Sequence, residues 1–119
     1  MGTEQLSWCY QKGHGTDQDY NKTFEFYTKS AEHRNSEAMN NVGFCYYNGF
    51  GCDQNKTKAF EWYEKSAQLG YTSAMWNVGN FYEIGIGVTK DLNKAKEWYT
   101  KAAAQGNVRA QEKLDTLNQ

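Results

Sequence analysis

Two glycine-rich motifs are the parts of this chain that most resemble ligand-binding chemistry. Gly49-Phe50-Gly51 and Gly85-Ile86-Gly87 have the Gly-x-Gly spacing found in phosphate-binding loops. Such a loop follows a β-strand and begins a helix within a βαβ unit, whereas both motifs here join two helical patterns. We therefore interpret them as turns between helices.

The chain has three cysteines and two histidines, at Cys9, Cys45, Cys52, His14 and His33. A zinc site or a catalytic dyad needs several such groups to converge, and their spacing indicates no convergence. Cys9 and Cys45 share a column of an internal repeat with Phe81, which predicts a small apolar core position. Cys52 falls in a loop. The sequence leaves open whether Cys45 and Cys52 form a disulfide. We expect no enzyme activity, no cofactor and no metal.

Charge and hydropathy exclude two classes of partner. The chain has 119 residues, with 13 Lys and Arg against 14 Asp and Glu and a net charge of −1, so it has no global attraction for nucleic acid. The longest apolar run, Phe44 to Tyr47, is four residues, compared with the roughly 20 that cross a bilayer. An odd number of cysteines is unusual for a secreted scaffold. We therefore expect a cytoplasmic protein without an export signal, which binds neither nucleic acid nor membrane.

The chain repeats itself every 36 residues. The period is visible in Ala38, Ala74 and Ala110, and in Tyr27, Tyr63 and Tyr99. Residues 38–73 and 74–109 align without gaps and share 16 identical positions of 36. A fixed period of this length is typical of helical repeats that stack into a solenoid.

Each period predicts two helices and two short loops. Ala38, Val42 and Cys45 recur at the i, i+4, i+7 spacing of one helical face. We expect helices at about 4–12, 20–33, 36–48, 55–69, 73–84, 91–105 and 108–118, and no strand.

Several repeated columns have a predicted structural role. Asp19, Asn55 and Asp91 offer a side-chain oxygen where a helix N-cap is needed, and Gly70 and Gly106 suit the left-handed conformation at a helix C-terminus. Gly43 and Gly79 fall inside helices, where Gly is unfavourable, so we expect a neighbouring helix to approach closely there. The second helices carry Glu25 with Lys29, Glu61 with Lys65 and Glu97 with Lys101, which we interpret as i, i+4 pairs on a solvated convex face.

At these residues the chain resembles Sel-one-like repeats (SLR), relatives of the tetratricopeptide repeat (TPR). The motifs are Ala74, Val78-Gly79, Tyr82, Gly85-Ile86-Gly87-Val88, Asp91, Lys94-Ala95, Trp98-Tyr99, Lys101-Ala102-Ala103 and Gly106, with the same frame in residues 38–70. The first period departs from the pattern at Ser7, Thr23 and Arg34. The resemblance implies an α/α hairpin repeat that acts as a scaffold for assembling other proteins.

The expected fold is all-α, a right-handed superhelical solenoid of about three helix-turn-helix repeats plus a C-terminal capping helix. The single domain, 1–119, would divide into hairpins at about 3–34, 35–70 and 71–106 and a cap at 107–119. In the cap we expect Ala110, Leu114 and Leu117 to face inward, and Arg109, Glu112, Lys113, Asp115 and Asn118 outward.

The first helices of a stacked solenoid line its concave surface, so their spare positions form the candidate site. These positions are Glu4, Trp8, Gln11, Asn40, Phe44, Tyr47, Trp76, Asn80 and Glu83, with Asn41 and Asn77 at the edge. Aromatic side chains supply strong contacts at interfaces, and amides pair with an extended backbone. We predict that all of them except Glu4 and the two edge residues bind a partner. The alternative that Trp8 and Trp76 only pack between neighbouring first helices stays open.

The predicted function is a non-catalytic scaffold or adaptor that holds a peptide or loop of another protein in this groove. The alternative is a structural self-assembly module, a homo-oligomer or part of a longer array, which associates through its N-terminal end. That end carries apolar residues, Leu6, Trp8, Cys9 and Tyr10, and lacks a polar capping helix.

Overall fold

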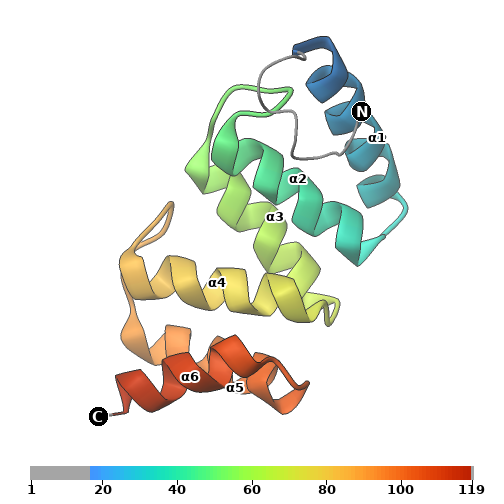
Figure 1. Ribbon diagram of the computed structural model, residues 1–119. Coiled ribbons are helices and arrows are strands. Elements are labelled where there is room, and N and C mark those ends of the chain that lie inside the picture. The colour runs from blue at the N-terminus through green and yellow to red at the C-terminus, as the bar shows by residue number, and fades with distance from the viewer. Residues whose placement is uncertain (1–16, 119) are drawn as a thin grey trace.

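The computed structural model describes residues 17–118, which form six helices and the turns between them (Figure 1). The helices are α1 (Asp17–Glu32), α2 (Ser36–Asn48), α3 (Lys56–Gln68), α4 (Thr72–Ile84), α5 (Leu92–Ala104) and α6 (Val108–Leu117). They stack in chain order from α1 at one end to α6 at the other (Figure 1). Residues 17–118 contain no strand, which confirms the predicted all-α repeat fold. The predicted helix at 4–12 lies outside the described residues.

The 36-residue period assigns each helix a role. We call α2, α4 and α6 the first helices of their repeats, and α1, α3 and α5 the second helices. Each helix packs against the next one in the chain, so that α3 lies between α2 and α4, and α5 between α4 and α6. The two Gly-x-Gly motifs join α2 to α3 and α4 to α5, which confirms that they are turns.

Two of the three predicted N-caps form. The Asn55 side chain accepts a hydrogen bond from the backbone N–H of Lys58 at 2.9 Å, and Asp91 accepts one from Lys94 at 3.1 Å. The prediction for Asp19 was wrong, because α1 begins at Asp17 and includes Asp19. Because the helix begins two residues earlier, Asp19 lies in its first turn and not before it.

The mid-helix glycines Gly43 and Gly79 lie against the tyrosines of the following second helix, as predicted. A Cβ added at Gly79 would lie 2.7 Å from the Cδ1 and Cε1 atoms of Tyr99, and one at Gly43 would lie 2.8 Å from Cδ1 of Tyr63. Both rings are nearly or fully buried. The absence of a side chain at these two positions therefore allows the tyrosine ring of each hairpin to pack against the first helix.

The remaining core combines small and β-branched residues with larger side chains such as Phe60, Phe81 and Met75. Val42, Val78, Ala59 and Ala95 have no exposed surface, and Cys45 is 3% exposed, which confirms the predicted core position of Cys45. One polar side chain is buried with them. The hydroxyl of Ser66 donates to the backbone carbonyl of Ser36 at 2.6 Å and so joins α3 to α2.

Two lysines of the second helices, Lys65 and Lys101, contact tryptophans, and the predicted i, i+4 ion pairs do not form among the described residues. Lys65 Nζ lies 4.5 Å from the ring centroid of Trp62, and Lys101 Nζ lies 4.4 Å from that of Trp98. Among the described residues, no ion pair joins a lysine of these helices to the glutamate four residues before it. A tryptophan three residues before a lysine is equally within reach on a helix, and its face attracts the cation.

The last helix has the predicted inward face. Ala110 is fully buried, and Leu114 and Leu117 pack against the core. Arg109, Glu112 and Asp115 are exposed, as predicted, and the Arg109 guanidinium lies over the ring of Trp76. The prediction was wrong for Lys113, which is partly buried in an ion pair with Glu83.

Candidate functional site

The candidate site is one face of the first helices, made by the side chains that the repeat pattern left over from the core. We call it the first-helix face. Its described residues are Asn40, Phe44 and Tyr47 on α2, Trp76, Asn80 and Glu83 on α4, and Arg109 and Lys113 on α6. Trp8 and Gln11, also predicted for this site, lie outside the described residues.

Polar side chains link α2 to α4 across this face. The side-chain amide of Asn77 donates to the Oδ1 atom of Asn40 at 3.0 Å. Because each amide carries two donor hydrogens and an acceptor oxygen, the pair keeps spare donors and the oxygen of Asn77 for a ligand. Asn80, one turn further along α4, is half-buried.

Phe44 is the most exposed aromatic residue of the first-helix face, with 49% of its surface accessible. Its ring centroid lies 5.7 Å from that of Phe50, which stacks on Tyr20 of α1 at 4.8 Å. Phe44, Phe50 and Tyr20 therefore form an aromatic row from α2 to α1. Sequence reasoning missed Phe50 and Tyr20, and the apolar residue between two glycines was the available signal.

Tyr47 has a different environment and is half-buried. Its ring lies 5.6 Å from that of Phe81 on α4, and Lys56 Nζ lies 5.7 Å from its centroid. Tyr47 thus joins two first helices and leaves part of its surface on the face.

Glu83 is held by two partners and is not a free carboxylate. It accepts a hydrogen bond from the hydroxyl of Tyr99 at 2.7 Å and pairs with Lys113 Nζ at 3.3 Å. Burial raises the pKa of Tyr99 above its ordinary value, and the hydrogen bond to the Glu83 carboxylate and its negative charge raise it further. The carboxylate therefore connects α4 to α5 and α6.

Trp76 is half-buried between α5 and α6. Its ring lies 6.4 Å from the ring of Tyr99, and the guanidinium carbon of Arg109 lies 4.1 Å from its centroid. The indole Nε1 atom is buried without a hydrogen-bond partner among the described residues. Sequence reasoning selected Trp76 but missed Arg109, because no short-range pattern connects residues 33 positions apart.

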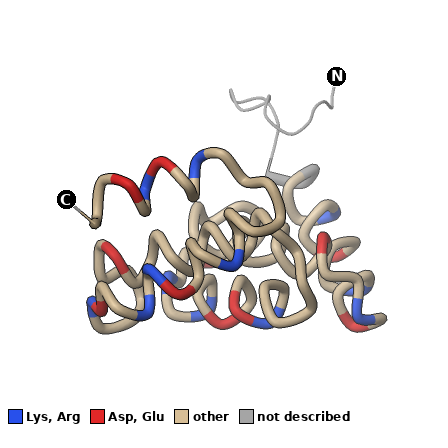
Figure 2. The backbone as a smooth tube through the Cα atoms, turned by 90° about the horizontal axis from the view of Figure 1, so that it is seen from below, with Lys and Arg blue, Asp and Glu red and all other residues tan. Residues whose placement is uncertain are grey.

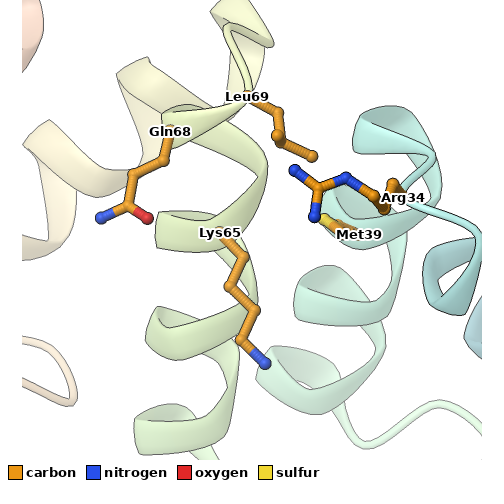
Figure 3. Close-up of a pocket in the computed structure, with 5 residues that line it drawn as sticks. All are labelled: Arg34, Met39, Lys65, Gln68 and Leu69. Carbon is orange, nitrogen blue, oxygen red and sulfur yellow. The ribbon is translucent and has the colours of Figure 1, made fainter.

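A small cavity opens elsewhere on the molecule, where the loop after α1 meets α2 and the C-terminal end of α3 (Figure 3). Its volume is about 200 Å³, and it is lined by Arg34, Met39, Lys65, Gln68 and Leu69. Small-molecule sites usually measure about 300 to 1,000 Å³. The cavity contains none of the predicted site residues.

Reactive groups are few in the described part of the chain. Cys45 and Cys52 are free thiols, so the disulfide left open above does not form. Burial is the larger cause that raises the pKa of Cys45 to about 12, and a thiol that stays protonated is a poor nucleophile. Across residues 17–118 no group of three or more His, Cys, Asp or Glu side chains could hold a metal, and no described helix is long and apolar enough to span a bilayer. Figure 2 shows acidic and basic residues interspersed along the helices.

The geometry of repeated hairpins has a direct counterpart among known families. The Sel1 repeat model matches residues 2–35, 36–71 and 72–107. The chain belongs to the Sel1 repeat family. Sel1 repeat proteins are generally scaffolds for protein–protein interaction and are typically non-catalytic.

Solved structures of Sel1 repeats resemble this chain closely. A Sel1 repeat protein from Oxalobacter formigenes is 33% identical with a TM-score of 0.71, over 84% of this chain and 88% of its own. A protective antigen of uropathogenic Escherichia coli with an SLR fold is 38% identical with a TM-score of 0.76, over 85% of this chain but 22% of its own. Cysteine-rich protein B of Helicobacter pylori is 26% identical with a TM-score of 0.72, over 75% of this chain and 67% of its own. A comparison with curated proteins gives no match.

Proposed function

We propose that this Sel1 repeat chain binds a peptide or an extended loop of a partner protein along the concave side formed by the first helices. The partner-binding residues are Trp8, Gln11, Asn40, Phe44, Tyr47, Trp76, Asn80 and Glu83. The observation that carries the proposal is the half-exposed ring of Phe44 one helical turn after Asn40, whose side chain pairs with Asn77. An apolar anchor next to spare amide donors suits an extended backbone with one large apolar side chain.

The first experiment selects peptides from a random display library with the purified chain and then measures their affinity for two variants. Phe44→Ala removes an exposed ring of the first-helix face, and Leu92→Ala, the control, removes an apolar side chain that is 42% exposed on α5. We expect Phe44→Ala to weaken binding at least about tenfold, equivalent to ~1.4 kcal/mol. Leu92→Ala should leave the affinity unchanged. Equal affinity for Phe44→Ala and the unsubstituted chain would refute the proposed groove.

A second candidate function is self-association through the N-terminal end of the array. Phe26 supports it, because a large apolar side chain on the first described helix is mostly exposed. Sedimentation velocity over a wide range of concentrations tests it directly. The hypothesis requires a larger species that Phe26→Ala reduces, whereas a monomer at every concentration contradicts it.

A further inference from the structure

Trp76 presents a hydrogen-bond donor that the described part of the chain does not use. The residue is half-buried, yet its Nε1 atom has almost no solvent contact and no acceptor among the described residues. A buried N–H without a partner loses its hydrogen bonds to water and gains no hydrogen bond from the protein, which is unfavourable. Because native structures pair the great majority of such groups, an orphaned one needs an explanation.

Arg109 places a second set of unused donors over the face of the same indole ring. It is exposed, and its guanidinium carbon lies 4.1 Å from the centroid of the Trp76 ring. Among the residues whose side chains the structure describes, 20–118, the only ion pair is the one between Lys113 and Glu83, so the guanidinium has no carboxylate partner among them. A guanidinium has five N–H donors and no acceptor.

The surrounding charges leave Arg109 available. Glu83, the nearby carboxylate of α4, is occupied by Lys113 at 3.3 Å and by the hydroxyl of Tyr99 at 2.7 Å. Glu112, one turn along α6, is exposed and forms no ion pair among the described residues. A ligand at Trp76 therefore meets one unpaired cation.

We propose that Trp76 and Arg109 form a subsite for a carboxylate of the bound peptide. This subsite rests on the proposed function and specifies one chemical group of the ligand. In this arrangement the guanidinium of Arg109 first swings off the indole face and uncovers the Trp76 Nε1–H. One carboxylate oxygen then accepts that N–H, and the other oxygen accepts from the guanidinium. A carboxylate matches the site because it accepts from both donors and balances one positive charge. The carboxylate can come from an acidic side chain or from the C-terminus of the peptide.

The test follows the indole N–H signals in ¹⁵N-correlated NMR spectra of the full chain. The chain has four tryptophans, and Trp76→Phe identifies the Trp76 signal by its loss. Three short acetylated peptides are added at millimolar concentration: one with an internal Glu and an amidated C-terminus, one with Gln in place of Glu, and one with Gln and a free C-terminal carboxylate. We expect the Trp76 signal to move with at least one carboxylate peptide and not with the Gln amide, while the signal of Trp98 stays in place.

Two variants make the assignment to this subsite specific. Arg109→Gln should raise the apparent Kd for the carboxylate peptide by about tenfold, and Lys101→Gln, which removes a cation over Trp98, should not change it. Which of the two carboxylate peptides moves the Trp76 signal also shows whether the bound carboxylate comes from an acidic side chain or from the C-terminus. Three results would overturn the proposal: no shift of the Trp76 signal with either carboxylate peptide, an equal shift with the Gln amide peptide, or the same shift and Kd in Arg109→Gln as in the unsubstituted chain.

Failure of the subsite is distinguishable from failure of the proposed function. If display-selected peptides lose affinity in Phe44→Ala but bind equally well after their carboxylates are neutralised, the groove stands and the subsite is wrong. If no peptide depends on Phe44 while the small carboxylate peptides still move the Trp76 signal, the subsite stands and the proposed groove is wrong.

Discussion

The substitution Gly79→Ala tests whether close packing between α4 and α5 holds the repeat together. On an exposed helix surface, replacing Gly with Ala stabilises by about 1 kcal/mol. Here the new Cβ would lie 2.7 Å from two carbon atoms of the Tyr99 ring. Real Cβ atoms do not tolerate that separation, so the ring or the helix must move.

Tyr99 has little freedom to move. It has no exposed surface, and its hydroxyl is held by Glu83 at 2.7 Å. Overpacking a well-filled core costs about 1 to 3 kcal/mol, and this position belongs near the upper end because both the ring and its hydroxyl are fixed. After the helix-propensity gain of about 1 kcal/mol is subtracted, we expect Gly79→Ala to lower the free energy of unfolding by about 1 to 2 kcal/mol.

Urea denaturation followed by circular dichroism at the helical signal measures this difference. Gly70→Ala is the matched control, because nothing lies within 4 Å of the added Cβ and only the left-handed backbone, with φ of 96°, opposes it. That control should lose about 1 kcal/mol through backbone strain alone. A Gly79→Ala chain as stable as the original, or more stable, would show that the Tyr99 ring is not tightly packed against α4.

Three further predictions concern the core and the caps. Tyr99→Phe removes the hydrogen bond to Glu83 and should cost about 1.5 to 3 kcal/mol, measured by the same denaturation. Asn55→Ala removes the N-cap of α3 and should cost about 1 kcal/mol, with Asn55→Ser close to neutral. In the folded chain Cys45 should resist iodoacetamide at pH 8 and react once urea unfolds it. Burial raises the pKa of the Cys45 thiol from 9.0 to about 12. Above about pH 9 the unfolded chain therefore loses the thiol proton while the folded chain keeps it, so the free energy of unfolding falls as the pH rises. A Cys45→Ala chain should show a shallower decline, and an equal decline would assign the effect to other groups.

Much of the fold could be predicted because its causes are local or repeated. The spacing of Ala38, Val42 and Cys45 identifies a buried helical face. The repeated glycine at Gly79 indicates where a neighbouring helix approaches closely, and the repeated polar residue at Asn55 indicates a helix N-cap. In each case the residue type itself has the required property. The 36-residue period repeats each of these assignments, although the Asn55 column also predicted a cap at Asp19, which lies inside α1.

The contacts of the lysines could not be decided from spacing. Lys65 has Glu61 four residues before it and Trp62 three residues before it, and both lie within reach on a helix. The structure favours the tryptophan. An exposed ion pair gains little, because water already solvates both charges, whereas the ring also covers the methylene groups of the lysine.

The two charged contacts of α6 could not be predicted either. Arg109 meets Trp76, and Lys113 meets Glu83, across 33 and 30 positions of sequence. The pattern of α6 separates apolar from polar residues, but it does not indicate which polar residues lie next to the preceding first helix. Only the crossing of α6 over α4 decides this, and that crossing depends on the packing of both helices against α5.

In the proposed function, the aromatic residues of the first-helix face combine binding with packing, and a solenoid cannot easily separate the two. Consecutive first helices have few contacts with each other, and side chains such as Tyr47 and Trp76 supply them by packing against α4, α5 and α6. Because the same rings remain half-exposed, a partner that binds them also acts on the joints between repeats. A bound peptide should therefore stabilise the array by more than its local contacts suggest, and alanine at Tyr47 or Trp76 perturbs binding and stacking together. Phe44, which projects furthest into solvent, is the position at which binding can be tested with the least effect on the stack.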